Sequence, residues 1–304
     1  MVQTVTGDVN ADRLGLVLPH EHIYLDGFTT ALSPDLILDD PRTAREELTL
    51  FQNAGGTTIV ELTIHGLNPD PVGLRAISEE LGILIVAGTG FYWERFYPSW
   101  MQGMPVAALT RLLVGEIEKG IAGTDVRAGI IGEIGSGNRA ISPAEESVFR
   151  AAAAAQRETG VPISTHAPFG RVGRLQVQLL EDAGADLSRV VIGHVDTVHD
   201  VEYHEELVRR GVWIAYDTIG RLDSGTDDQR ADAVAEMVRR GHAQKILLSS
   251  DVCRRTHLHA YGGHGYDHVI TSFLPRLERR GLDQKTLALL TRENPRRLLT
   301  RAAS

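Results

Sequence analysis

Short apolar and β-branched runs recur along this chain, and each is separated from the next by a longer stretch with helical periodicity. Runs of this kind that are bounded by turn residues predict buried strands. Eight strands are predicted: Leu14–Leu18, Thr57–Leu62, Leu84–Ala87, Ala128–Gly132, Pro162–Thr165, Val190–Gly193, Val212–Tyr216 and Lys245–Ser249. The intervening helices include Ala44–Ala54, Val106–Gly120, Pro143–Thr159, Arg171–Ala183 and Asp227–Arg240. A strand followed by a helix, repeated eight times over roughly 250 residues, predicts an α/β fold of the (β/α)8 TIM barrel type.

Local signals support several of these boundaries. Ser142-Pro143 followed by two glutamates is typical of a capped helix start, and Gly160, Gly211 and Gly241 follow predicted helix ends. The first ten residues are expected to form a small hairpin under the barrel, and Leu282–Leu299 one or two closing helices. Since no low-complexity linker divides the chain, residues 1–304 are predicted to form a single domain.

A doubly wound open sheet is the alternative architecture. Such a sheet normally has a glycine-rich phosphate loop after its first strand. Here the first predicted strand runs into His20-Glu21-His22 instead, and the glycines of Gly132–Gly137 lack the spacing of a dinucleotide fingerprint. The barrel is therefore preferred.

Composition narrows the possible functions. A hydrophobic content of 42% and a charged content of 23% are ordinary for a globular protein, while the net charge of -9 argues against nucleic acid as a partner. The single cysteine excludes an internal disulfide framework and suits a reducing compartment. Neither a signal peptide nor an apolar run of transmembrane length is recognised, so a cytoplasmic location without a membrane partner is expected.

The motif His20-Glu21-His22 is the first indication of a metal-binding site. Residues two apart on a strand point to the same face, so both imidazoles are expected to project together and Glu21 to turn the other way. Two neutral histidines side by side form a metal-binding pair. Because the chain has 12 histidines, this spacing alone is weak evidence.

Later strands supply further candidate ligands at their carboxyl ends, which converge on one mouth in a barrel. These residues are Glu133, His166, His194 and Asp251. Four histidines and two carboxylates exceed the needs of one metal ion and suit two. Nitrogen and oxygen ligands without thiolate fit Zn, Mn, Co or Ni. Each residue taken alone could have a structural role instead, in a loop hydrogen bond or a helix cap. To replace the metal site, such a role would have to apply independently at five strand ends, so the metal site is preferred.

Several ordered motifs resemble the phosphotriesterase family of the amidohydrolase superfamily. They are Leu18–His22, Gly129–Gly135, Pro162–His166, Ile192–His194 and Leu248–Asp251. Three later segments resemble the phosphotriesterase homology proteins in particular: Tyr216–Gly220, Gly262–Asp267 and Arg292–Pro295. The similarity extends over nearly the whole chain.

This resemblance implies roles for individual residues. His20, His22 and Asp251 would hold a buried metal ion, and His166 and His194 a more exposed one. Glu133 would bridge the two ions, where many family members use a carbamylated lysine. Tyr92 corresponds to a substrate-facing tyrosine of related lactonases, although a packed aromatic residue is the alternative. The resemblance also implies two divalent ions per chain, with zinc preferred, and a homodimer.

Two dications close together lower the pKa of a shared water from about 15.7 towards neutrality. The resulting metal-bridging hydroxide would attack a carbonyl or phosphoryl centre of a small-molecule substrate. Asp251 would act as the proton shuttle to the leaving group. Cys253 is interpreted as structural, and His65, His199, His204 and His242 receive no role.

The substrate is predicted from departures from the triesterase pattern. Thr197 and Thr218 stand where triesterases are expected to place an aspartate and a histidine beyond the metals, so a carbonyl substrate, a lactone first, is preferred. Arg254 or Arg255 could bind an anionic substrate group, with internal salt bridges as the equal alternative. An acyl-homoserine lactone would need an apolar channel, for which Trp93, Phe96, Tyr97 and Trp100 are candidates.

Three other functions stay open. One is a phosphotriesterase with promiscuous esterase activity, and another is a binding protein that retains metal without turnover. The third is a mononuclear deaminase or peptidase of the same superfamily, which predicts about one metal ion per chain and no dependence on Glu133.

Overall fold

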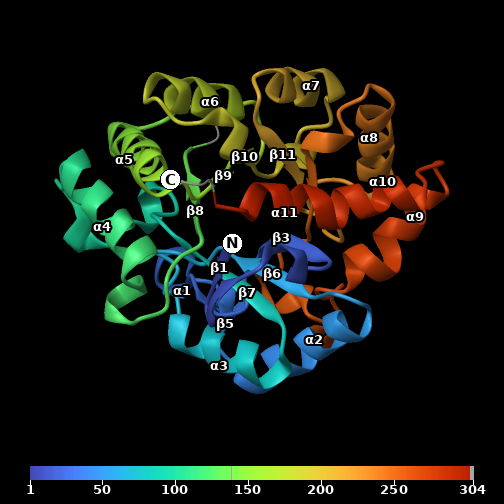
Figure 1. Cartoon of the computed structure of the whole chain (residues 1–304), viewed down its shortest axis with the longest axis horizontal. Helices are drawn as coiled ribbons and strands as arrows, with labels where there is room; N and C mark the ends of the chain where they lie inside the picture. Colours follow the sequence, from blue (N-terminus) through green and yellow to red (C-terminus); the bar gives the residue numbers. More distant parts are fainter. Residues whose placement is uncertain (138, 302–304) are drawn as a thin grey trace.

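Eight parallel strands form the central sheet of the computed structural model, which describes residues 1–137 and 139–301. The strands follow one another around the sheet in chain order (Figure 1). Their bounds are Val17–Glu21 (β3), Thr58–Glu61 (β6), Leu84–Thr89 (β7), Ile130–Gly135 (β8), Ile163–His166 (β9), Val190–Ile192 (β10), Trp213–Tyr216 (β11) and Ile246–Leu248 (β12). The predicted barrel is confirmed.

The barrel closes where the first strand β3 meets the last strand β12. Ser249 links the two strands, because its hydroxyl accepts from the amide of His20 at 3.1 Å and lies 2.9 Å from the carbonyl oxygen of His20. The amide of His22 donates to the carbonyl of Val252 at 3.2 Å. This seam lies at the carboxyl-terminal ends of the strands, where the predicted ligands are.

Helices surround the sheet as an outer ring (Figure 1). Their apolar faces pack on the strands; Leu48, Phe51 and Phe149, for example, are fully buried in the main core. The ring helices are Pro41–Asn53 (α2), Pro71–Leu81 (α3), Val106–Glu118 (α4), Pro143–Thr159 (α5), Gly173–Asp182 (α6), Val201–Arg209 (α7) and Asp227–Arg239 (α8). Shorter helices are Phe28–Ala31 (α1), Leu274–Glu278 (α9), Gln284–Ala288 (α10) and Asn294–Leu299 (α11).

The predicted N-terminal hairpin is confirmed as Val2–Thr4 (β1) paired antiparallel with Gly7–Val9 (β2). It covers the amino-terminal end of the barrel, where Val2 and Val9 share a cluster with Leu299 of α11. The closing helices predicted over Leu282–Leu299 are present as α10 and α11. The single domain over residues 1–304 stays a prediction, and residues 302–304 lie outside the described residues.

The strand bounds differ from the prediction by up to three residues, and the two largest extensions at carboxyl ends concern ligands. The first strand contains His20 instead of ending at Leu18, and β8 runs beyond Glu133 to Gly135. Each strand has a register irregularity, between Leu18 and Glu21 in β3 and between Ile131 and Ile134 in β8. Pairing to neighbouring strands therefore continues past the apolar residues on which the prediction was based.

A smaller sheet lies near the mouth, formed by Leu25–Asp26 (β4) and Ile37–Leu38 (β5). Within the described part of the chain, no helix has both the length and the apolar character needed to span a membrane.

Replacing Ser142 by alanine is expected to lower the free energy of unfolding by about 1 kcal/mol. The Ser142 hydroxyl caps α5 by accepting from the amide of Glu145, whose carboxylate accepts from the amide of Ser142 in return. Urea unfolding followed by circular dichroism measures the change. Ser147→Ala in the same helix is the control, because its hydroxyl is exposed and bonds only locally to the carbonyl of Pro143. Equal effects of the two variants would contradict the capping argument.

Candidate metal centre

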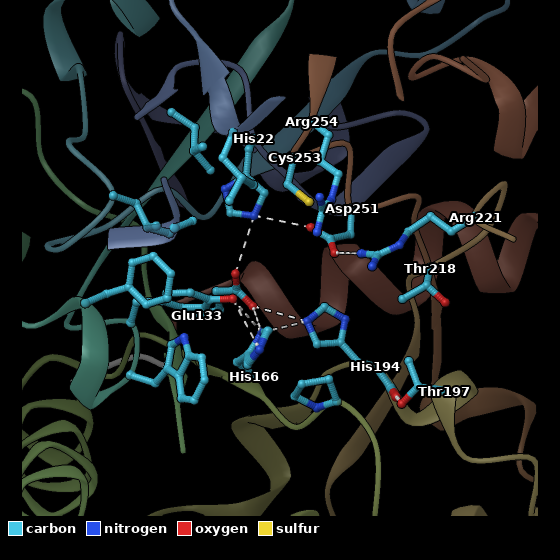
Figure 2. A pocket seen from close by; sticks show the side chains of 18 of the residues that line it. His22, Glu133, His166, His194, Thr197, Thr218, Arg221, Asp251, Cys253 and Arg254 are labelled. Carbon is cyan, nitrogen blue, oxygen red and sulfur yellow. Dashed lines mark hydrogen bonds and ion pairs between the residues drawn. The ribbon is translucent and has the colours of Figure 1, made fainter. Parts of the chain in front are cut away.

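Six side chains predicted from strand ends come together at the carboxyl-terminal mouth of the barrel (Figure 2). They come from five strands or the residues that follow them: His20 and His22, Glu133, His166, His194 and Asp251. All six are buried apart from His166, which is partly exposed. The convergence expected from barrel geometry is therefore present.

Glu133 lies among the four histidines, and Figure 2 shows it facing His22, His166 and His194. One carboxylate oxygen is 3.4 Å from Nε2 of His22. The other is 2.8 Å from Nδ1 of His166, 3.3 Å from Nε2 of His194 and 3.4 Å from Nε2 of His20. One oxygen thus faces His22 and the other faces His20, His166 and His194, so a single carboxylate reaches both histidine pairs, as a bridging ligand must.

Asp251 closes the site from the β12 side. Its Oδ1 lies 3.3 Å from Nε2 of His22 and 3.7 Å from Nε2 of His20. Asp251 and His194 both have left-handed backbone conformations, with φ of 47° and 56°. Residues other than glycine rarely adopt this conformation and need surrounding contacts to hold it.

The donor set fits divalent metal ions. Among the described residues, Nε2 of His20 is a buried atom without a hydrogen-bond partner, although carboxylate oxygens lie nearby. Two groups of potential ligand atoms share Glu133: one with His20 and His22, the other with His166 and His194. The donors are imidazole nitrogens and carboxylate oxygens, which suit Zn, Mn, Co or Ni.

Asp217 supports both histidine pairs and had no role in the sequence prediction. One of its oxygens accepts from Nδ1 of His20 at 2.8 Å. The other is 2.9 Å from Nδ1 of His194 and also accepts from the amide of His194 at 2.8 Å. With Nδ1 held in this way, Nε2 of each ring is turned towards Glu133. The position of Asp217, directly after β11, was the signal that could have identified it.

Glu21 turns away from the metal side, as predicted, and its carboxylate holds the turn that carries Asp251. It accepts from the hydroxyl of Ser249 at 2.7 Å and from the amides of Ser250 and Val252 at 2.8 Å each. Burial raises the pKa of Glu21 to about 7, against the opposing effect of these bonds. The middle residue of the motif therefore positions a ligand from the opposite end of the chain.

The protein's own charges favour protonated histidines at this site. Burial alone would lower the pKa of His22, but Asp251 and Glu133 outweigh it and raise the pKa to about 9. For His194, Asp217 and Glu133 likewise outweigh burial and raise the pKa to about 10. The pKa of His20 also lies well above its ordinary value, because Glu133 and Asp217 outweigh burial. Metal ions and protons therefore compete for the same nitrogens.

A cavity of about 400 Å³ opens at this centre, and five of the six side chains line it: His22, Glu133, His166, His194 and Asp251. One wall is aromatic, with Tyr92, Trp93 and Phe96. The phenol oxygen of Tyr92 is 3.2 Å from Nε2 of His166. Cys253 also lines the cavity, and burial raises the pKa of its thiol well above the ordinary value, so the thiol stays protonated.

The two arginines predicted to bind an anion are placed differently. Among the described residues, the cavity lining includes Arg254 but not Arg255. Arg255 donates to the carbonyl of Ile37 at 2.7 Å and pairs with Asp39 at 3.1 Å, so its contacts favour the internal salt-bridge alternative. Arg254 has only a long ion pair, 3.7 Å, to Asp35.

Thr197 and Thr218 line the cavity near His194 (Figure 2), but their hydroxyls have other partners. Thr197 donates to the carbonyl of His194 at 2.8 Å, and Thr218 donates to the carboxylate of Asp196 at 2.8 Å. Instead, Oδ2 of Asp251 accepts from Nη1 of Arg221 at 2.5 Å. The sequence prediction missed Arg221.

A sequence model of the phosphotriesterase family matches residues 1–299. The chain belongs to the phosphotriesterase family. It is 37% identical to the phosphotriesterase homology protein of Escherichia coli K12, over 93% of this chain and 97% of that protein. The crystal structure of the Escherichia coli protein, with phosphate in its active site, superposes with a TM-score of 0.92 at 36% identity, covering 95% of this chain and 100% of that one.

Two further similar proteins are named for the hydrolysis of different bonds. An N-acetyltaurine hydrolase of Dictyostelium discoideum is 34% identical, over 98% of this chain and 97% of that protein. A lactonase from Listeria monocytogenes has a TM-score of 0.94 at 28% identity, covering 99% of each chain. Family membership and these relatives make the chain a hydrolase of the phosphotriesterase family.

Asp217→Asn is expected to weaken divalent metal binding about 10- to 100-fold. Asparagine offers one acceptor where two imidazole N–H groups need one each, so His20 or His194 loses its orientation. Competition with a chromophoric chelator measures the affinity. Glu116→Gln is the control, because that buried carboxylate holds His65 in the same way but outside the metal centre. Unchanged affinity in Asp217→Asn would contradict the role of Asp217.

Loading of chelator-treated protein with metal near neutral pH is expected to release protons, among them those of His20, His22 and His194, whose pKa values are raised. Because their raised pKa values keep them protonated below about 9 for His22 and about 10 for His194, the release should fall as pH rises through these values. A pH-stat titration in weak buffer measures it. Release that is absent at neutral pH would contradict the assigned charge states.

Proposed function

We propose that this protein hydrolyses carboxylic esters, lactones first, at a centre of two divalent metal ions held by His20, His22, Glu133, His166, His194 and Asp251. The observation that carries the proposal is the placement of Glu133, whose single carboxylate faces both histidine pairs. A carboxylate in that position serves two ions and has little use for one. Zinc is the preferred metal, with Mn, Co or Ni as the other candidates.

A carbonyl substrate is favoured over a phosphotriester by the surroundings of Asp251. The hydroxyls of Thr197 and Thr218 are bonded to His194 and Asp196, so the triesterase relay positions give Asp251 no polar support. The related lactonase and N-acetyltaurine hydrolase also support this choice, since lactones and N-acetyl amides both react at a carbonyl carbon.

Bound divalent ions would supply Lewis acidity and lower the pKa of water at this site. Asp251 accepts the proton lost by the attacking water and delivers it to the leaving oxygen. Tyr92, whose pKa burial raises well above its ordinary value, stays protonated and donates a hydrogen bond to the substrate. The aromatic wall of Tyr92, Trp93 and Phe96 excludes water and packs on the apolar part of the substrate.

A second candidate activity is the hydrolysis of an N-acyl amide that carries an anionic group. Two observations favour it: several relatives are N-acetyltaurine hydrolases, and the Arg254 side chain lines the cavity at 40% exposure with only its long ion pair to Asp35. A guanidinium in this state can bind a carboxylate, sulfonate or phosphate through two hydrogen bonds. The predicted homodimer and cytoplasmic location stay predictions.

Asp251→Asn is expected to lower turnover of the best substrate about 10²- to 10⁴-fold, because asparagine cannot accept the proton. A pH-indicator screen of metal-loaded protein would cover plain, acyl-homoserine and phosphorylated sugar lactones, with one phosphotriester. N-acetyltaurine hydrolysis is followed by detection of the amine. Asp200→Asn, which alters the partly buried cap of α7 outside the centre, is the control.

The outcomes separate the candidate functions. Turnover of the phosphotriester alone would contradict the argument from Thr197 and Thr218. Two bound ions with no turnover of any substrate would favour the metal-retaining binding protein, and one ion per chain the mononuclear alternative. A higher KM for anionic substrates alone in Arg254→Ala would support the anion-binding role.

A further inference from the structure

Arg221 follows β11 and lies at the edge of the cavity, where its side chain points at Asp251 (Figure 2). Its Nη1 donates to Oδ2 of Asp251 at 2.5 Å. The same guanidinium pairs with Asp223 on its other side, through Nη2 at 2.9 Å and Nε at 3.3 Å. Arg221 is thus held between two carboxylates, and only 13% of its side chain is exposed.

This double pairing distinguishes Arg221 from Arg254, the other arginine near Asp251. Arg254 is 40% exposed and has one long ion pair, so it is available to a substrate anion. The charge of Arg221 is already balanced by Asp251 and Asp223, and most of its donors face them. Binding a substrate anion there would require breaking a buried, charge-assisted contact. Its contacts therefore suit an intramolecular role.

The loop that carries Arg221 is fixed by a fully buried arginine on α8. The Nη1 atom of Arg230 donates to the carbonyl of Arg221 at 2.9 Å, and its Nε pairs with Asp196 at 3.0 Å. Nη2 of Arg230 donates to the hydroxyls of Thr218 and Ser224, each at 2.9 Å. A side chain projecting from a loop braced in this way reaches Asp251 from a defined direction.

The two oxygens of Asp251 consequently have separate partners. Oδ1 faces the histidines of β3, at 3.3 Å from Nε2 of His22, while Oδ2 is bonded to Arg221. Rotation of the carboxylate would break the contact with Arg221. Because the threonines at the relay positions are bonded elsewhere, Arg221 is the polar side chain that faces this oxygen among the described cavity residues.

We propose that Arg221 is the positioning residue that orients the carboxylate of Asp251 for proton transfer, in place of the relay that Thr197 and Thr218 do not provide. The proposal rests on the proposed function, in which Asp251 moves the proton. It assigns to Arg221 an effect on kcat, and to Arg254 any effect on the binding of anionic substrates.

The test compares Arg221→Ala and Arg221→Lys with Arg42→Ala, a variant that removes an exposed arginine of α2 outside the cavity. In Arg221→Ala, kcat for the best substrate should fall about 10- to 100-fold with KM unchanged. Guanidinium chloride at a non-denaturing concentration should restore part of kcat, while sodium chloride at equal ionic strength should not. Arg221→Lys should retain intermediate activity, and Arg42→Ala should match the parent protein.

A second readout is independent of turnover. In the cobalt-substituted protein, the visible absorption of Co²⁺ reports the geometry of its ligands. Arg221→Ala should change this spectrum with the metal content unchanged, and guanidinium should reverse the change. Metal content is measured by elemental analysis, and the melting temperature of each variant records any loss of stability.

Each result decides the role of Arg221. Loss of kcat with guanidinium rescue and a reversible spectral change would support positioning. An unchanged kcat with an unchanged spectrum, a fall in kcat that guanidinium does not rescue, or an increase in KM for anionic substrates alone would overturn it. If the parent protein hydrolyses none of the substrates, the proposed function fails, and the cobalt spectrum alone decides the contact of Arg221 with Asp251.

Discussion

The carboxylate of Glu133, buried among four imidazoles, is the interaction on which the rest of the site depends. A buried carboxylate is costly unless charged or hydrogen-bonding partners surround it. Here burial would raise the pKa of Glu133, but His166 and His20 outweigh it and hold the pKa well below the ordinary value. These partners come from strands far apart in the sequence. Only a closed barrel, in which all strands end at one mouth, brings them to the same carboxylate.

Barrel closure and the placement of Asp251 depend on the same hydrogen bonds. Glu21 on the first strand holds the hydroxyl of Ser249 and the amides on either side of Asp251. The left-handed backbone of Asp251 is thereby stabilised by the strand that supplies His20 and His22. A fold in which β3 and β12 failed to meet would lose the seam and this ligand together.

The cavity has an aromatic side and a side that carries two arginines. The aromatic wall around Tyr92 and Phe96 offers apolar contact, and the opposite side carries Arg221 and Arg254. Of these two cations, one is confined between Asp251 and Asp223, while the other is half open to the cavity. Similar residues in one pocket therefore differ in function because their neighbours differ, which no count of arginines in the sequence reveals.

The sequence by itself determined the fold and the six candidate ligands, because both depend on local pattern. Alternating apolar strands and amphipathic helices specify a barrel, and polar residues at strand ends then share one mouth. Tertiary structure alone decided the support around them. Asp217 bonds to His20 across 197 residues, and Glu21 to the turn at Ser250 across 229. Such contacts form only when strands from distant parts of the chain close on each other, and side-chain direction at a turn is set by those contacts and not by residue type.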